Sequence, residues 1–306
     1  MNIISKELHK IKPGILLYGE GWTAGSSPLP DSLRALKKSA YKLNDIAVFN
    51  DDIRDGIKGS VFEHSEKGFA SGRPGMEESI KFGIVASCLH PQVDYSKVNY
   101  SKAAYAANPL NTISYCECHD NHTLWDKLAI SAKEATEEER KEMHKLALSI
   151  VLTSQGISFL HAGTEFLRSK KGVENSFESP DNINAIDWSL KTKNKDVFDY
   201  VKALIKMRKE HPAFRMVSGR QVANNIRFIE NLPDGVVAYT INGAQVSDPW
   251  KKIIVLFNGS DKLKFMDLPI GNWKLAITNN RFMTDDSNRS SVDLAPHSCS
   301  VYYLQD

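Results

Sequence analysis

The chain has 306 residues, of which 42% are hydrophobic and 25% are charged. This composition is typical of a globular protein with one large domain, or with a large and a small one, and it excludes disordered and fibrous classes. The formal net charge of +2 is too balanced for a nucleic-acid partner or a membrane surface, either of which would call for clustered lysine and arginine.

The start of the sequence has no continuous apolar stretch of the kind found in signal peptides, and no apolar run reaches transmembrane length. As written, the chain is therefore expected to be cytoplasmic. A secreted or periplasmic location would require a signal lost with a missing upstream half. The four cysteines are too few and too scattered for a disulfide framework or a zinc knuckle, and plain packing is expected for Cys88, Cys116, Cys118 and Cys299.

Residues 1–212 alternate between short apolar runs and helical patterns, as parallel strands covered by helices do. The apolar runs predict strands at 15–18, 46–49, 112–118 and 157–160. Helical spacing predicts helices at 76–88, 136–153 and 196–209. The helix at 136–153 has the clearest start, because Thr136 can cap it and Glu139 stands at the capping-box position.

Residues 213–306 show a different pattern, in which short strands are separated by turn signals such as Asn242-Gly243. Strands are expected at 222–229, 236–241, 253–257, 273–278 and 300–304. The sequence therefore predicts two domains: an α/β domain over 1–212 and a separate antiparallel β-domain over 213–306.

Each predicted strand of the first domain is followed by polar residues, and the first case is Glu20, which stands between Gly19 and Gly21. Glycines allow a sharp turn at the strand end and leave the carboxylate uncrowded. A carboxyl group beside an apolar ring has a raised pKa, which suits a general acid. The alternative is a surface glutamate in a glycine-rich turn.

Several of these stretches closely resemble the conserved regions of type I pullulanases, which are debranching enzymes of the α-amylase family (glycoside hydrolase family 13). The main matches are residues 18–22 and 115–127, and the others are 49–59, 156–168 and 175–188. The resemblance implies a (β/α)8 TIM barrel followed by a β-sandwich, and a retaining hydrolase that acts on α-1,6 bonds of pullulan, starch or glycogen-like glucans.

The resemblance also implies roles for individual residues. Glu20 corresponds to the general acid/base after strand five, and Asp120 to the transition-state-stabilising carboxylate after strand seven. His119 would hydrogen-bond sugar hydroxyls, and Trp22 would lie near the sugar path. The remaining implied substrate contacts are Asn121, Asn175 and Asp181.

One family element is missing. Retention requires a carboxylate nucleophile about 5 Å from the acid, and the family's nucleophile follows strand four in a segment that this sequence lacks. The chain therefore resembles the C-terminal half of a pullulanase, covering strands five to eight of the barrel. It is expected to be inactive alone and to need a complementary N-terminal half, or to pair with another copy of itself. The alternatives are a non-catalytic glucan-binding remnant and an α-1,4-acting enzyme of the α-amylase family.

Simpler structural roles remain open for several of these residues. Asp120 could be the N-cap of a helix over 122–130, a position that aspartate fills well, and His119 could be a core histidine. Asp51, Arg54 and Asp55 could form an ion-pair network that fixes a loop.

No cofactor is required by the implied chemistry. Calcium is possible but unsupported, because the adjacent acids at 51–52 alone offer too few oxygen ligands.

Overall fold

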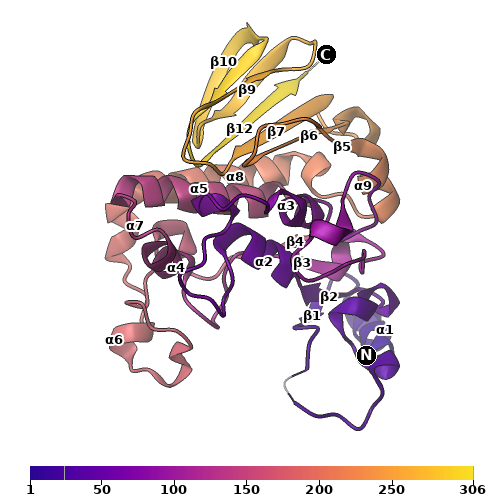
Figure 1. Ribbon diagram of the computed structural model, residues 1–306. Helices are drawn as coiled ribbons and strands as arrows, with labels where there is room; N and C mark the ends of the chain where they lie inside the picture. The colour runs from indigo at the N-terminus through magenta and orange to yellow at the C-terminus, as the bar shows by residue number, and fades with distance from the viewer. Residues whose placement is uncertain (24, 306) are drawn as a thin grey trace.

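The computed structural model describes residues 1–23 and 25–305, apart from the side chains of 284–287. The first part of the chain forms a four-stranded parallel sheet in the order β1-β2-β3-β4 (Figure 1). Its strands are β1 (Leu17–Gly19), β2 (Ile46–Phe49), β3 (Thr112–Ser114) and β4 (Ile157–Ser158). The four predicted parallel strands are confirmed, and they form an open sheet with β1 and β4 at its edges. A barrel is not seen in the chain by itself.

The strand predicted over 112–118 is wrong beyond Ser114. The neighbouring strand β2 pairs with β3 only through Val48 and Phe49, because the chain turns into a helix at Asp51. Without a partner on that side, the backbone after Ser114 has no ladder to join, although residues 115–118 stay largely buried. The predicted strands at 15–18 and 157–160 are likewise displaced or shortened.

Nine α-helices surround this sheet and lead out of it. They are α1 (Asn2–Ile11), α2 (Asp51–Lys58), α3 (Glu77–Ile84), α4 (Leu124–Ser131), α5 (Glu137–Thr153), α6 (Asp181–Asn184), α7 (Ser189–Lys193), α8 (Lys195–Glu210) and α9 (Gly219–Asn225) within the described ranges. The capping box of α5 is confirmed: the Thr136 hydroxyl oxygen accepts from Glu139 N at 3.2 Å, and the Glu139 carboxylate accepts from Thr136 N at 2.7 Å.

The second part of the chain forms a six-stranded antiparallel sheet in the order β10-β9-β12-β7-β6-β5, together with a β11-β8 pair. Its strands are β5 (Ile226–Phe228), β6 (Val236–Ile241), β7 (Lys252–Asn258), β8 (Lys264–Asp267), β9 (Trp273–Thr278), β10 (Arg281–Arg289), β11 (Ser291–Leu294) and β12 (Ser298–Leu304). The strand predicted at 222–229 is wrong over its first half. There the Ser218 side chain caps α9 by accepting from Gln221 N at 3.2 Å, so strand β5 starts only at Ile226.

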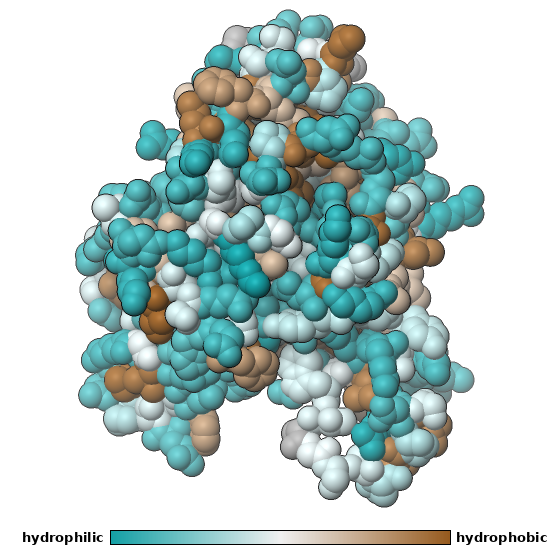
Figure 2. All heavy atoms as spheres, in the orientation of Figure 1, coloured by the Kyte–Doolittle hydropathy of each residue, from teal (hydrophilic) through white to brown (hydrophobic). Residues whose placement is uncertain are grey.

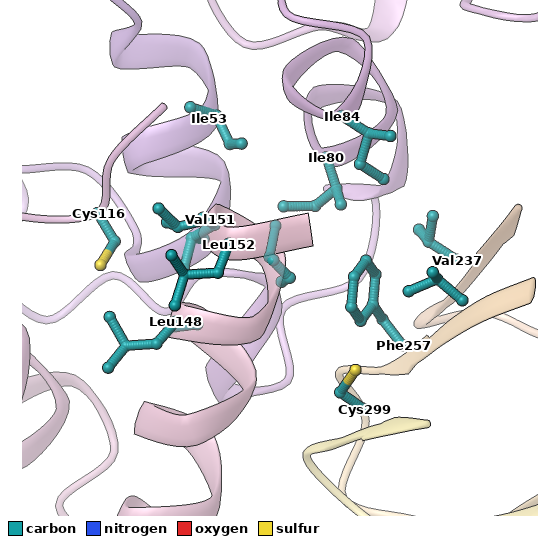
Figure 3. Close-up of a cluster of buried hydrophobic side chains, with 14 of the residues drawn as sticks. Ile53, Ile80, Ile84, Cys116, Leu148, Val151, Leu152, Val237, Phe257 and Cys299 are labelled. Carbon is teal, nitrogen blue, oxygen red and sulfur yellow. The ribbon is translucent and has the colours of Figure 1, made fainter. Parts of the chain in front are cut away.

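One apolar cluster joins the two parts of the chain. It contains residues of α3 and α5 together with Val237, Phe257 and Cys299 from the antiparallel sheet. Figure 3 shows Phe257 and Val237 facing Ile80 and Ile84 of α3. A hydrogen bond crosses the same boundary, from the Tyr239 hydroxyl to the Thr153 carbonyl oxygen at 3.1 Å. The antiparallel sheet is therefore packed on the helices that cover the parallel sheet.

No helix within 1–23 and 25–305 is both long enough and apolar enough to cross a membrane.

Substitution of Phe257 tests whether the two parts of the chain share one core. Its side chain is fully buried, whereas Phe265 on β8 is 70% exposed. We expect Phe257→Ala to lower the free energy of unfolding by about 3–5 kcal/mol because it leaves a cavity. Phe265→Ala, the matched control, should change it by less than about 0.5 kcal/mol. The measurement is urea unfolding followed by far-UV circular dichroism and tryptophan fluorescence. If Phe257→Ala lowered the free energy of unfolding measured by only one of the two signals, that result would contradict a shared core.

Candidate active site

Polar residues that follow all four parallel strands meet in one cleft with a volume of about 480 Å³. Figure 2 shows the surface hollowed between the lobe that carries α6 and the loop that follows β1. The lining residues are Glu20, Trp22, Phe49, Asp51, Arg54, Val61, Phe62, Tyr115, Cys118, His119, Asp120, Asn121, Asn175 and Phe177. The cleft thus brings together six of the seven residues that sequence reasoning selected. The seventh, Asp181, begins α6 and is exposed outside this lining.

Glu20 follows β1 directly and reaches the cleft through a tight turn. Gly21 has φ of 79°, and a Cβ there would come within 2.9 Å of Val48 Cβ. Glycine is therefore required by conformation and by space. Glu20 itself is exposed, and Trp22 is 41% exposed. The apolar surroundings that the sequence predicted for this carboxylate are not supplied by the chain alone.

His119 and Asp120 lie side by side after β3. The His119 Nε2 atom is 3.3 Å from Asp120 Oδ1, and both side chains are more than half exposed. The reading of His119 as a core histidine is therefore wrong. The alternative role of Asp120 as a helix cap is also wrong. Thr123 is the N-cap of α4, and its side chain accepts from Asp126 N at 3.2 Å. Asp120 is thus free to face the cleft.

Two asparagines tie the loop after β3 to the loop after β4. Asn121 and Asn175 have φ of 62° and 45°, the left-handed region that asparagine tolerates better than most residues. The Asn121 backbone N–H donates to Asn175 Oδ1 at 3.0 Å, and its side-chain amide donates to Glu174 Oε1 at 3.3 Å. The geometry of this cleft wall is therefore held by backbone conformation and by side-chain contacts together.

Charged residues at the cleft confirm the predicted ion pairing of Asp51, Arg54 and Asp55 only in part: Arg54 pairs with Asp55, Asp51 pairs with Lys37, and all three residues lie on helix α2 and not in a loop. Arg54 donates through Nε to Asp55 Oδ1 at 2.5 Å and through Nη1 to the Tyr115 hydroxyl at 3.1 Å. Burial acts to lower the pKa of Arg54, but the hydrogen bonds to Asp55 and the nearby charges outweigh it and raise that pKa. Burial raises the pKa of Asp51, while its ion pair with Lys37 acts in the opposite direction.

Apart from Trp22, sequence reasoning did not select the aromatic residues of this region. The Phe49 ring lies 4.8 Å from that of Tyr115 and 5.4 Å from that of Phe159, between ring centroids. Phe62 and Phe177, which also line the cleft, are 81% and 80% exposed. The signal for Phe49 was its position at the end of a strand, directly before polar residues, and the signal for Tyr115 was its place in the matched stretch 115–127. Phe62 lies in an irregular segment and gave no signal, whereas Phe177 stands in the matched stretch 175–188 but was not selected.

Comparisons with known proteins agree on one family. Residues 222–281 match the family model described as "Pullulanase, all-beta domain". The pullulanase of Bacillus subtilis (strain 168) is 36% identical over 251 residues, which are 82% of this chain and 33% of that protein. Among solved structures, the pullulanase from Bacillus acidopullulyticus superposes with a TM-score of 0.89 at 38% identity, over 99% of this chain and 36% of that one.

The pullulanase from Paenibacillus barengoltzii, solved in complex with maltohexaose and alpha-cyclodextrin, gives a TM-score of 0.89 at 38% identity and covers 100% of this chain and 46% of that one. The chain spans about a third of the length of the Bacillus subtilis relative. Sequence and structure agree over almost the whole chain, and the chain therefore belongs to the pullulanase family.

Proposed function

We propose that this chain supplies the general acid and a transition-state-stabilising carboxylate of a retaining hydrolase for α-1,6-glucosidic bonds in α-glucans. The observation that carries the proposal is the convergence of Glu20 and Asp120, which follow different strands, on one cleft with His119. Solved relatives have been described with maltohexaose and with maltose, which supports an α-glucan as the substrate of this cleft.

The chemistry assigns one task to each group. Glu20 would protonate the glycosidic oxygen as the leaving sugar departs, and Asp120 would stabilise the positive charge that develops on the sugar ring. His119, exposed beside Asp120, would donate to sugar hydroxyls, and Trp22 would pack against the apolar face of a sugar. The reaction needs carboxyl groups and water, and we propose no cofactor for it.

Retention also needs a carboxylate nucleophile about 5–5.5 Å from the acid, and we place it on a partner segment. In this proposal β1 to β4 are strands five to eight of a (β/α)8 barrel, and residues 213–306 form the accompanying β-domain. The exposed positions next to the β1 edge, with Leu16 at 63% and Tyr18 at 57%, support a segment that packs there. Such a segment would also provide the enclosure that Glu20 lacks.

A second function, glucan binding without catalysis, is favoured by one observation. Three aromatic residues that line the cleft, Trp22, Phe62 and Phe177, are exposed in this chain by itself. Exposed aromatic rings along a cleft suit the apolar faces of sugar rings, because stacking removes apolar area from water on both partners. Binding of this kind needs no partner segment.

The catalytic proposal can be tested by completing the enzyme. The chain alone should not hydrolyse pullulan, whereas the chain fused after the preceding part of the Bacillus subtilis pullulanase should do so. In that fusion, Glu20→Gln should lower kcat about 10²–10⁴-fold because the leaving oxygen loses its proton donor. The matched control is Glu7→Gln on α1, outside the cleft, which should leave kcat unchanged. Robust hydrolysis by the purified chain alone would contradict the need for an external nucleophile.

The binding role of Trp22 can be tested on the chain alone. Titration with maltohexaose, followed by isothermal calorimetry, should give a measurable Kd for the parent chain. Trp22→Ala should weaken binding at least about fivefold, since it removes about 1 kcal/mol of apolar contact. Trp188→Ala is the matched control, because Trp188 is 65% exposed and lies outside the cleft lining. Equal Kd values for the two variants would exclude Trp22 from the sugar path.

A further inference from the structure

Three potential metal ligands from separate segments converge beside the cleft. His64 lies between α2 and α3, His122 follows β3, and Glu174 lies in the loop after β4. One ligand atom from each lies within 4.8 Å of the other two. His64 Nε2 is 3.1 Å from Glu174 Oε2, and the two imidazole rings meet edge to face with centroids 4.7 Å apart. None of the three has a role in the function proposed above.

We propose that His64, His122 and Glu174 bind one divalent transition-metal ion, with Zn²⁺ as the best match. Two imidazoles and one carboxylate, with water as a fourth ligand, are a recurrent zinc set, whereas Ca²⁺ and Mg²⁺ prefer oxygen ligands. Ligand bonds of about 2.0–2.2 Å in a tetrahedron put neighbouring donors roughly 3.3–3.6 Å apart. The His64–Glu174 contact is already close to this spacing.

His122 is the fixed member of the set. It is 5% exposed, and its Nε2 lies 3.2 Å from the Gly172 carbonyl oxygen. A carbonyl accepts only, so Nε2 carries the proton and Nδ1 keeps a lone pair, an arrangement common in metal-binding histidines. Burial lowers the pKa of His122, and nearby His64 acts in the same direction.

The two outer ligands sit on loops that the fold holds in place. Lys127 Nζ donates to the carbonyl oxygens of Ser60, Glu63 and His64, each at 2.8 Å. The Asp126 carboxylate accepts from the Ser169 hydroxyl at 2.6 Å and from Lys170 N at 2.8 Å. Two neighbouring residues of α4 thereby anchor both loops, and this support limits how far the ligands must move to bind an ion.

A bound ion would act on the cleft through contacts already present. Glu174 holds the side chain of Asn121 through its other oxygen, Oε1, and Asn121 lines the cleft next to Asp120. An ion on Oε2 would join the loops after α2, β3 and β4 at one point and stiffen that wall. The inference does not depend on the hydrolase proposal, because it concerns binding of the metal itself.

The experiment is titration of the purified, EDTA-treated chain with ZnCl₂ by isothermal calorimetry. We expect one equivalent to bind with a Kd below about 10 µM. His64→Gln and Glu174→Gln should each weaken binding at least tenfold. The matched control, His9→Gln on α1, should bind like the parent. Binding weaker than about 100 µM, or equal binding by parent, H64Q and E174Q, would overturn the proposal.

Two further measurements, of Co²⁺ absorption and of the Tm with Zn²⁺, test which residues bind the ion. Co²⁺ should give visible d–d absorption without the thiolate charge-transfer band that coordination by Cys118 would produce; a thiolate band would overturn the assignment. Zn²⁺ should raise the Tm of the parent chain but not that of His64→Gln. Folding of each variant is checked in EDTA by circular dichroism. The exposed side chain of His64, at 44%, makes its replacement tolerable, and Glu174→Gln decides the case if His64→Gln fails to fold.

Discussion

The burial of α5 from Met143 to Thr153 is the packing constraint on which both sheets depend. Every residue in this stretch is buried, so the helix must be covered on all sides. Helices α4 and α8 pack on it, and strand β12 contacts it from the antiparallel sheet. Its last turn is fixed by Arg208 of α8, which donates to the carbonyl oxygens of Leu152 and Ser154 at 3.1 and 2.7 Å. The position of β4, which starts only a few residues later, follows from this arrangement.

Buried polar side chains constrain the position of the backbone nearer the cleft. Helix α2 is buried along almost its whole length although most of its residues are polar or charged. Its Lys58 donates to the His122 carbonyl oxygen at 3.3 Å, and burial lowers the pKa of that lysine. Such groups are costly unless they find partners. Arg54 pairs with Asp55 and donates to the Tyr115 hydroxyl, and Lys58 donates to the His122 carbonyl oxygen. The last two contacts hold the backbone on both sides of Asp120.

The sequence predicted those parts of the fold whose pattern is local. The helix at 136–153 was predictable from Thr136 and Glu139, and strands 236–241 and 273–278 from their apolar residues and turn signals. Helix α2 was not, because its sequence of alternating charges suggests a solvated loop and only tertiary partners make it a buried helix. The strand prediction was wrong over the first half of 222–229 because Ser218, which lies outside the apolar run, caps helix α9 there.

The candidate site was likewise predictable from the sequence only in part. Glu20, His119 and Asp120 could be chosen because each follows a strand and parallel strands end at one edge. Asp181 could not be placed, since the path of the long loop after β4 depends on contacts with distant segments, such as those of Asn175 with Asn121 and of Ser169 with Asp126. The group at His64, His122 and Glu174 was not foreseeable either, because its members come from three loops whose approach depends on Lys127 and Asp126.

The left-handed backbone at Asn121 and Asn175 bears on how variation in this cleft should be interpreted. Glycine and asparagine adopt such φ values at low cost, whereas β-branched residues do not. A library randomised at these two positions would be filtered by chain conformation before any sugar is present. Restricted variation there would reflect folding of the cleft wall, and restricted variation at His119 or Trp22, which have ordinary backbones, would be the clearer record of selection by a ligand.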